Sequence, residues 1–342
     1  MYLKTALVIQ GPINSTGVAG AYSGTVRNAS ITDIVDFDTS DYIKINIMNA
    51  KNIFDILILS IWNSEFEKIK DKDFLRKDNV KIILNDDFVE KDELKLRNDY
   101  LALKFPSFAN NNMNKQWVTT NSGVAAAIEL GANYCFKIRT DQLIDIKLLA
   151  ETLISHANSL NKNKIIVPFC DFRKPWALPD FYLGGKCYLV EKLTYSLLYS
   201  PVRNFSQNVH DQLFFGGSYF LNYNRRDNWT TYIKKENNFS NKQNKIIINS
   251  WNNIWQIGPE KLFKSLVWRG QPIEFSRYNA YFENDNLTET INKNLSLNNK
   301  SNLNHDMIIR NYFPTYTQMS KIKRLIIKFI ILSLQKLFKI YG

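Results

Sequence analysis

Short apolar runs alternate with helical segments through the first half of the chain, and this alternation constrains the fold more than any other feature. Runs rich in Val, Ile, Leu and Phe lie at residues 5–10, 54–62, 79–87, 133–141 and 164–170. Helical periodicity fills the intervals at residues 41–53, 65–75, about 112–130, and 144–160. Strands that alternate with helices predict an α/β fold with a mostly parallel sheet and helices on both faces.

Polar or turn-forming residues follow the predicted strands at their carboxyl ends. These are Gln10-Gly11-Pro12, Ser60-Ile61-Trp62, residues 85–87, and Arg139-Thr140-Asp141. In open α/β sheets, ligands bind outside the carboxyl ends of the strands. We therefore expect these side chains to line one rim of the sheet.

The composition of the 342 residues is that of a globular protein, with 45% hydrophobic and 13% aromatic residues. The net charge is +12, and residues 321–339 contain six Lys or Arg and no acid. Basic and apolar side chains fall on largely opposite faces of a helix at 319–342, as in interfacial membrane helices. The alternative is a helix packed on the protein with a solvated basic face.

Neither an apolar leader nor an uncharged run long enough to span a membrane is evident in the sequence. The three cysteines, Cys135, Cys170 and Cys187, are too scattered for a disulfide framework and are expected to be buried thiols. Together with the basic C-terminal segment, these features predict a cytoplasmic protein, peripheral on the inner face of the inner membrane.

Asp141 is the most informative candidate for a metal site. A carboxylate at the end of a strand can bind Mg²⁺ or Mn²⁺, which in turn holds the phosphates of a nucleotide diphosphate. Lys137 and Arg139 point to the same face of that strand, and Arg139 could pair with a phosphate oxygen. The alternative is a strand-end ion pair between Arg139 and Asp141.

Two further segments carry candidate residues. Asn114, Lys115 and Gln116 begin a predicted helix, and helix N-termini favour anions, although simple capping explains the same pattern. Asp211, which opens a later predicted helix, is either a cap or a general base, and Asp180 is a second candidate base. His156 is interpreted as a helix-surface residue. Neither a G-x-G-x-x-G nor a G-x-x-x-x-G-K-[ST] loop occurs.

Several of these segments occur together in an order that resembles a known family. They are "ALVIQGPI", "ILILSIWNSE", "NNNMNKQWVTTNSGVAAAIELGANYCFKIRTDQL" and "NVHDQLFFG". In this set the chain resembles the WavE family of lipopolysaccharide-synthesis proteins over roughly residues 4–220, most clearly over 110–143. The sequence departs from the family pattern at Lys115, where Arg is expected, and at Asp211, where Glu is expected.

The resemblance implies a GT-A-like fold and a hexosyltransferase-like enzyme that moves a sugar from a nucleotide-diphosphate donor to a lipid-linked or core saccharide. It implies a divalent cation, Mn²⁺ or Mg²⁺, at Asp141, and Asp211 or Asp180 as the catalytic base. The implied donor-binding residues are Gln10, Gly11, Pro12, Ser60, Trp62, Asn114, Lys115, Gln116, Arg139 and Asp141. The expected partners are the nucleotide-sugar donor, the lipid-linked or oligosaccharide acceptor and the inner membrane surface, with no nucleic acid.

The expected organisation is a GT-A-like domain at 1–275, with a nucleotide-sugar half at 1–145 and an acceptor half at 146–275. A polar Asn-rich linker at 276–318 follows, in which residues 283–305 are expected to be a loop or a disordered linker, and then the amphipathic helix at 319–342. Two other functions stay open. A sugar nucleotidyltransferase would need a basic Gly-rich loop after the first strand, which "QGPINSTG" lacks. A non-catalytic basic protein that binds membranes or nucleic acid would use basic and aromatic residues such as those at 222–235.

Overall fold

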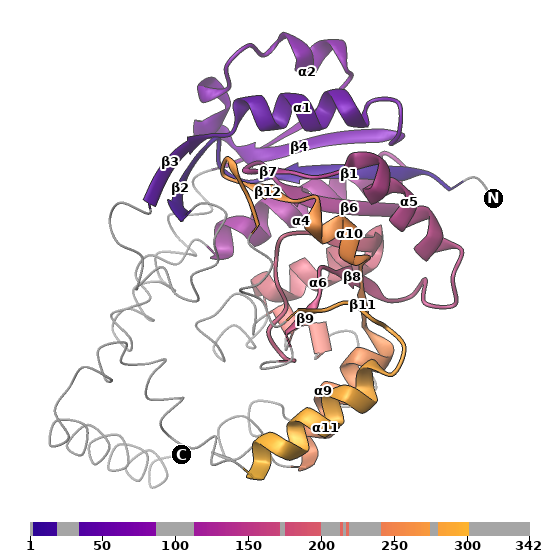
Figure 1. Ribbon diagram of the computed structural model, residues 1–342. Helices are drawn as coiled ribbons and strands as arrows, with labels where there is room; N and C mark the ends of the chain where they lie inside the picture. Colours follow the sequence, from indigo (N-terminus) through magenta and orange to yellow (C-terminus); the bar gives the residue numbers. More distant parts are fainter. Residues whose placement is uncertain are drawn as a thin grey trace, which may run out of the picture.

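The computed structural model describes residues 3–18, 34–86, 113–171, 175–199, 213–214, 217–218, 241–273 and 280–300. Its centre is a seven-stranded sheet in the order β11-β8-β10-β6-β1-β4-β5 (Figure 1). The strands are β1 Thr5–Gln10, β4 Ile56–Trp62, β5 Lys81–Asn85, β6 Tyr134–Arg139, β8 Ile165–Val167, β10 Leu183–Lys186 and β11 Trp255–Ile257. In this sheet β10 runs antiparallel to both of its neighbours, and the remaining pairs are parallel. The predicted α/β class with a mostly parallel sheet is confirmed, and the GT-A-like assignment stays a prediction.

Alternate residues of β1 enter different cores, which explains why the strand is apolar between Thr5 and Gln10. Leu7 and Ile9 belong to a core shared with α1 Ser40–Ala50 and α5 Ile146–Ala157. Ala6 and Val8 belong to a core on the opposite face, beneath α4 Met113–Glu129. Helices on both faces exclude water from the strand, so its four central positions are apolar and its two polar end residues, Thr5 and Gln10, form hydrogen bonds within the protein.

Small residues let α4 lie close to the sheet, as predicted. A Cβ at Gly123 would lie 2.6 Å from Val8 Cγ1 and 3.0 Å from Ser60 Cβ, so a larger residue does not fit there. Helix α6 Cys187–Tyr199 packs beside α4. Gly131 ends α4 with a φ of +86°, a value that glycine adopts without strain, which confirms the predicted C-cap.

The segment at 65–75 is less regular than predicted. A 3₁₀ helix, η3 Asn63–Lys68, is separated from the short helix α2 Asp73–Lys77. Asp71 lies between them with a φ of +49°, and a residue in this left-handed region cannot continue a right-handed helix. The single helix predicted here is therefore replaced by two short ones.

Small accessory sheets, which the sequence did not indicate, surround the carboxyl edge of the main sheet. Strands β2 Asn14–Val18 and β3 Ile34–Asp38 form an antiparallel pair directly after β1. Strands β7 Gln142–Leu143, β12 Val267–Trp268 and β13 Gln271–Pro272 form a second sheet next to β6. A third pairs β9 Cys170–Asp171 with β14 Ala280–Tyr281. The second sheet brings residues near 268 to the end of β6.

The expectation of a loop at 283–305 is wrong over residues 287–300. This segment forms α11 Leu287–Lys300, which packs against α9 Asn241–Asn253. Leu287 and Ile291, one helical turn apart, are buried in a core with Trp251 and Ile254 of the α9 region. A single apolar stripe is thus enough to dock a segment whose composition is otherwise polar. The predicted domain limits remain predictions.

His156 is also placed differently from its interpretation as a surface residue. It is buried, with Nδ1 2.7 Å from Gln256 Oε1 and Nε2 3.0 Å from the Lys164 carbonyl oxygen. Burial lowers the pKa of this imidazole. The interpretation failed because α5 is covered on that side by β8 and β11, a contact that spans 100 residues of sequence.

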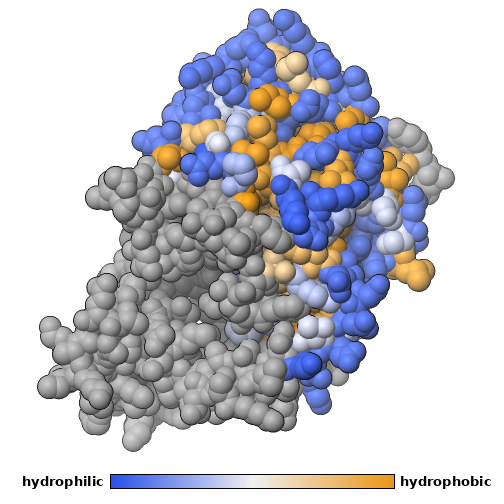
Figure 2. Space-filling view, viewed as in Figure 1, coloured by the Kyte–Doolittle hydropathy of each residue, from blue (hydrophilic) through white to orange (hydrophobic). Residues whose placement is uncertain are grey.

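The remaining predictions are partly confirmed. Cys135, Cys170 and Cys187 are buried free thiols, as expected. Within the described ranges, none of the helices has the length and apolar character needed to cross a membrane. Figure 2 shows mostly hydrophilic side chains around α1 and α2, although Ile45 and Met48 of α1 are exposed. The predicted helix at 319–342 lies outside the described residues.

Candidate active site at the carboxyl ends of β1 and β6

The chain reverses its direction of travel across the sheet between β1 and β6. From β1 it moves outward to β4 and β5, and it then returns to β6 on the other side of β1 (Figure 1). Gln10 and Arg139 are register partners at the carboxyl ends of these two strands. Such a switch point, where connections leave in opposite directions, is where open α/β sheets bind ligands.

The turn after β1 is packed tightly against the residue that follows β6. Gly11 has a φ of +138°, and a Cβ there would lie 2.6 Å from Thr140 Oγ1. Thr140 donates from its backbone N–H to the Gln10 carbonyl at 2.9 Å and from Oγ1 to the Pro12 carbonyl at 2.6 Å. Glycine is therefore required at position 11 by backbone conformation and by packing, independently of any ligand.

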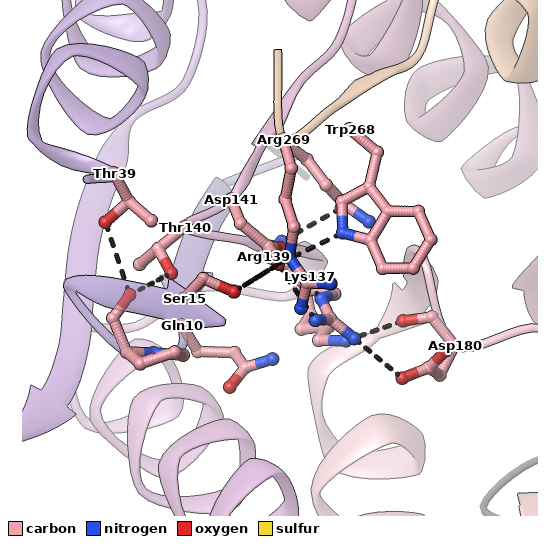
Figure 3. Close-up of polar contacts among 12 residues, drawn as sticks. Gln10, Ser15, Thr39, Lys137, Arg139, Thr140, Asp141, Asp180, Trp268 and Arg269 are labelled. Atoms are coloured by element: carbon pink, nitrogen blue, oxygen red, sulfur yellow. Dashed lines mark hydrogen bonds and ion pairs between the residues drawn. The ribbon is translucent and has the colours of Figure 1, made fainter. Parts of the chain in front are cut away.

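Asp141 lies at the centre of a buried ion-pair network. Its Oδ1 accepts a hydrogen bond from Arg139 Nε at 3.0 Å, and its Oδ2 accepts one from Arg139 Nη2 at 3.1 Å. Oδ2 also accepts from Ser15 Oγ at 2.8 Å, Trp268 Nε1 at 3.0 Å and Arg269 Nε at 3.0 Å. Figure 3 shows these donors converging on the carboxylate from β2, β6 and the β12–β13 turn. The carboxylate is thus enclosed by donors from three separate segments.

The electrostatics of Asp141 follow from this enclosure. Burial by itself would raise the pKa of the carboxyl group, but the charges of Arg139 and Arg269, with their hydrogen bonds, hold its pKa well below the usual range. The indole ring of Trp268 lies near both guanidinium groups, with its centroid 4.7 Å from Arg269 Cζ and 5.8 Å from Arg139 Cζ. Asp141 is therefore ionised at neutral pH.

Lys137 and Arg139 both reach Asp180, which confirms that they share a face of β6. Lys137 Nζ donates to the Asp180 carbonyl at 2.8 Å, and Arg139 Nη1 donates to Asp180 Oδ2 at 3.2 Å. Lys137 is fully buried, and burial lowers the pKa of its amine to about 7, against the opposing effect of the Asp180 charge. The two contacts fix Asp180 at the end of β6.

The residues around Asp141 do not fit a divalent cation. Mg²⁺ and Mn²⁺ take oxygen ligands, whereas the neighbours of this carboxylate are four N–H donors and a single hydroxyl. Oδ2 accepts four of these five hydrogen bonds and Oδ1 accepts one, and the whole residue is buried. Among the residues that the structure describes, no group of three or more His, Cys, Asp or Glu is placed to hold a metal ion. The cation predicted at Asp141 stays a prediction without support from this donor set.

Three predicted donor-binding side chains are occupied by contacts within the protein. Gln10 Oε1 accepts from Thr119 Oγ1 of α4 at 2.6 Å. Ser60 Oγ lies 3.1 Å from Ser122 Oγ, also of α4, and accepts from Asn85 Nδ2 at 3.1 Å. Trp62 is buried. Gln10 and Ser60 hold α4 over the carboxyl ends of β1 and β4, while Pro12 at the adjoining turn is exposed.

The predicted helix start at 114–116 is confirmed as the first turn of α4. Lys115 and Gln116 are partly exposed, and Gln116 Nε2 is buried with no hydrogen-bond partner in the described part of the chain. The side chain of Asn114 and the whole of Asp211 lie outside what the structure describes. Their predicted roles stay predictions.

Sequence reasoning missed Ser15, Trp268 and Arg269. Ser15 precedes Asp141 by 126 residues, and Arg269 follows it by 128. One local signal was available for the arginine. Arg269 and Gly270 form the two-residue turn between β12 and β13, and their φ values of +50° and +84° match a type I′ hairpin. Nothing in the sequence indicated that this turn would meet β6.

Comparisons with known proteins give structural likeness without a family. No family model matches the sequence, and no curated protein matches it. The resemblance to the WavE family therefore stays a prediction.

Similar solved structures include a cytidylyltransferase from Leptospira borgpetersenii, with 13% identity and a TM-score of 0.30. The match covers 57% of this chain and 65% of the cytidylyltransferase chain, which is just under two thirds of its length. Another is 4-diphosphocytidyl-2C-methyl-D-erythritol synthase from Anaerococcus prevotii, with 11% identity and a TM-score of 0.33 over 66% and 86%. A third is mouse xyloside xylosyltransferase 1 in its apo form, with 12% identity and a TM-score of 0.33 over 63% and 80%. Likeness at this level assigns no function.

Proposed function

We propose that this protein is a glycosyltransferase that moves a sugar from a nucleotide-diphosphate donor to a lipid-linked or core saccharide of a bacterial surface glycan. The observation that supports the proposal is the switch point between β1 and β6, where an exposed turn and a partly exposed arginine meet at the carboxyl edge of the sheet. This is the place where α/β sheets bind nucleotides and related ligands.

Each residue has a role that suits its position. The Gln10-Gly11-Pro12 turn would contact the nucleotide through Pro12, its exposed residue, while Gly11 lets Thr140 pack against the turn. Arg139, whose side chain is 19% exposed, and Lys115 at the start of α4 would neutralise charge on the diphosphate. Binding and orientation by these groups would lower the barrier for departure of the nucleoside diphosphate.

Two carboxylates remain candidates for the general base that an inverting reaction needs. Asp180 is 6% exposed, and its position is fixed because Arg139 binds its carboxylate and Lys137 binds its backbone carbonyl. Asp211 is the second candidate from the sequence. A base in either place would take the proton of the attacking acceptor hydroxyl, whereas a retaining reaction would need neither. The basic segment at 319–342 would keep the enzyme at the inner membrane surface.

The second candidate is a sugar nucleotidyltransferase. Such an enzyme would need basic groups after β1 to bind a triphosphate, and the described residues 11–18 include no Lys or Arg. In this region the chain turns directly into β2, whose register with β3 runs from Asn14↔Asp38 to Val18↔Ile34. These observations favour glycosyl transfer over nucleotidyl transfer.

A donor screen by thermal shift tests the proposal. UDP-, GDP-, CMP- and dTDP-sugars are added with and without Mn²⁺ to the wild type, to Lys115→Gln and to Lys147→Gln. Lys147 is an exposed residue of α5 and serves as the control. One donor at a hundred times its Kd stabilises the folded protein by about 2.7 kcal/mol, which raises Tm measurably. We expect that shift in the wild type and Lys147→Gln, and a smaller one in Lys115→Gln.

The released product distinguishes the candidates. Glycosyl transfer from, or slow hydrolysis of, a UDP-, GDP- or dTDP-sugar releases a nucleoside diphosphate, and the same reactions of a CMP-sugar release CMP. Nucleotidyl transfer instead consumes a nucleoside triphosphate and releases pyrophosphate. Binding of liposomes or oligonucleotides without any response to nucleotide sugars would favour a non-catalytic protein and would refute the proposal.

A further inference from the structure

The β12–β13 turn places an arginine where a divalent cation was expected. Arg269 donates from its backbone N–H to the Asp141 carbonyl at 3.0 Å and from Nε to Asp141 Oδ2 at 3.0 Å. Its Nε also lies 3.0 Å from Ser15 Oγ, the hydroxyl that donates to the same carboxylate. Arg269 therefore binds both the backbone and the side chain of Asp141.

The surroundings of Arg269 are built for its guanidinium group. A Cβ at Gly17 of β2 would lie 2.2 Å from Arg269 Nη1, so the absence of a side chain at position 17 makes room for it. The Trp268 ring lies 4.7 Å from Arg269 Cζ, and the arginine side chain is 9% exposed. Three elements, β2, β6 and β12, thus enclose one positive charge (Figure 3).

The backbone of Arg269 is held in an unfavourable conformation. Its φ of +50° lies in the left-handed region, where Asn, Asp and Gly are the usual residues of a type I′ turn. A non-glycine residue with a long side chain keeps such a conformation only when its contacts with the surrounding structure compensate for the unfavourable backbone energy. The contacts of Arg269 with Asp141 and Ser15 hold it in this conformation.

The charges at the end of β6 are balanced within the chain. Two carboxylates, Asp141 and Asp180, face two guanidinium groups, Arg139 and Arg269. A divalent cation on Asp141 Oδ2 would have to displace Arg269, and one on Oδ1 would have to enter a buried space beside the Arg139 guanidinium group, where repulsion between like charges opposes its binding.

We propose that Arg269 is a built-in counter-ion that supplies, from the chain itself, the positive charge that a divalent cation would supply at Asp141. Asp141 then binds no metal. It orients Arg139 through two hydrogen bonds, and Arg269 keeps the carboxylate ionised and in place. This inference concerns cation binding and holds whether or not the chain transfers a sugar.

The proposal is tested by titrating the full chain with Mn²⁺ alone. The free ion is measured by its electron paramagnetic resonance signal. Wild type and Asp141→Asn are compared after circular dichroism shows that both are folded. We expect their Mn²⁺ affinities to agree within threefold. A wild type that binds Mn²⁺ more than threefold more tightly than Asp141→Asn would overturn the proposal. If Asp141→Asn does not fold, Asp141→Asn/Arg269→Gln replaces it, because this variant removes the carboxylate and its counter-ion together.

A double-mutant cycle tests the pairing of Arg269 with Asp141 separately. Arg269→Gln should lower the Tm of the wild type by about 5 °C or more, because it removes one charge of a buried pair. In the Asp141→Asn background, Arg269→Gln should lower Tm by less than half as much as it does in the wild type. In the wild type, Arg269→Lys keeps the charge and should therefore lower Tm less than Arg269→Gln does. Equal losses in both backgrounds would overturn the role as counter-ion.

Discussion

Replacement of Asp141 by Asn should destabilise the protein strongly at neutral pH. The variant keeps the size of the side chain but removes its charge, and it places an NH₂ group where an oxygen now accepts hydrogen bonds. Oδ2 alone accepts from Ser15, Arg139, Trp268 and Arg269 at 2.8–3.1 Å, so the amide cannot satisfy the same donors. Two guanidinium groups, 19% and 9% exposed, would lose their shared counter-ion.

Breaking a buried ion pair from one side costs about 3–5 kcal/mol, which is a large part of the 5–15 kcal/mol typical of a folded domain. With a urea m-value near 3 kcal/mol/M, the midpoint of unfolding should fall by about 1–1.7 M. Urea titration followed by tryptophan fluorescence and circular dichroism measures this change. Asp41→Asn, at an exposed position in the first turn of α1, is the control and should change stability by no more than about 0.5 kcal/mol.

The effect should depend on pH in a defined direction. Because folding lowers the pKa of Asp141, the unfolded chain takes up the proton first as the pH falls. The stability difference between wild type and Asp141→Asn should therefore be constant from about pH 5 to 8 and should shrink below about pH 4, the usual pKa of Asp. A difference below 1 kcal/mol at pH 7, with an unchanged m-value, would refute the network at the end of β6.

Two further substitutions test the sheet on either side of this network. Gly184→Ala should lower the free energy of unfolding by about 1–3 kcal/mol, because a Cβ there would lie 2.3 Å from Cε1 of the buried Phe136 ring. If this clash is the cause, the double variant Gly184→Ala/Phe136→Leu should recover part of the loss. For Lys137→Met the prediction concerns pH. Since the pKa of Lys137 is lowered to about 7 on folding, the free energy of unfolding of the wild type should rise between pH 7 and 9.5 by on the order of 2–3 kcal/mol more than that of the variant. Unfolding midpoints that change with pH equally in both proteins would contradict the burial of this amine.

Local sequence patterns were sufficient for five strands of the main sheet, β1, β4, β5, β6 and β8, and for the helices α1, α4 and α5, whereas β10, β11 and α6 were not predicted. Strand β1 is apolar because both of its faces are covered, and α4 ends where Gly131 permits a positive φ. The alternation of strands and helices therefore predicted the α/β class correctly. It also placed Gln10 and Arg139, which are register partners, at the same edge of the sheet.

The content of the candidate site could not be predicted in the same way. Arg139 and Asp141 are two residues apart, so their pairing was foreseen as an alternative to metal binding. Ser15, Trp268 and Arg269 reach Asp141 only through accessory strands of two to five residues, which are too short to give a periodic signal. The burial of His156 and the docking of α11 depend on similar long-range contacts.

The contact between Ser15 and Arg269 spans 254 residues, and this separation has a consequence for folding during synthesis. The residues of strands β1, β4, β5 and β6 have all been synthesised once residue 139 is added, whereas Arg269 is added 130 residues later. At about 5–20 residues per second, this interval lasts roughly 7–26 s. Throughout it, Asp141 has Arg139 as a partner but lacks the second arginine and the indole. The nascent sheet therefore forms with its carboxyl edge unfinished, and the β12–β13 turn completes that edge as a late step of folding.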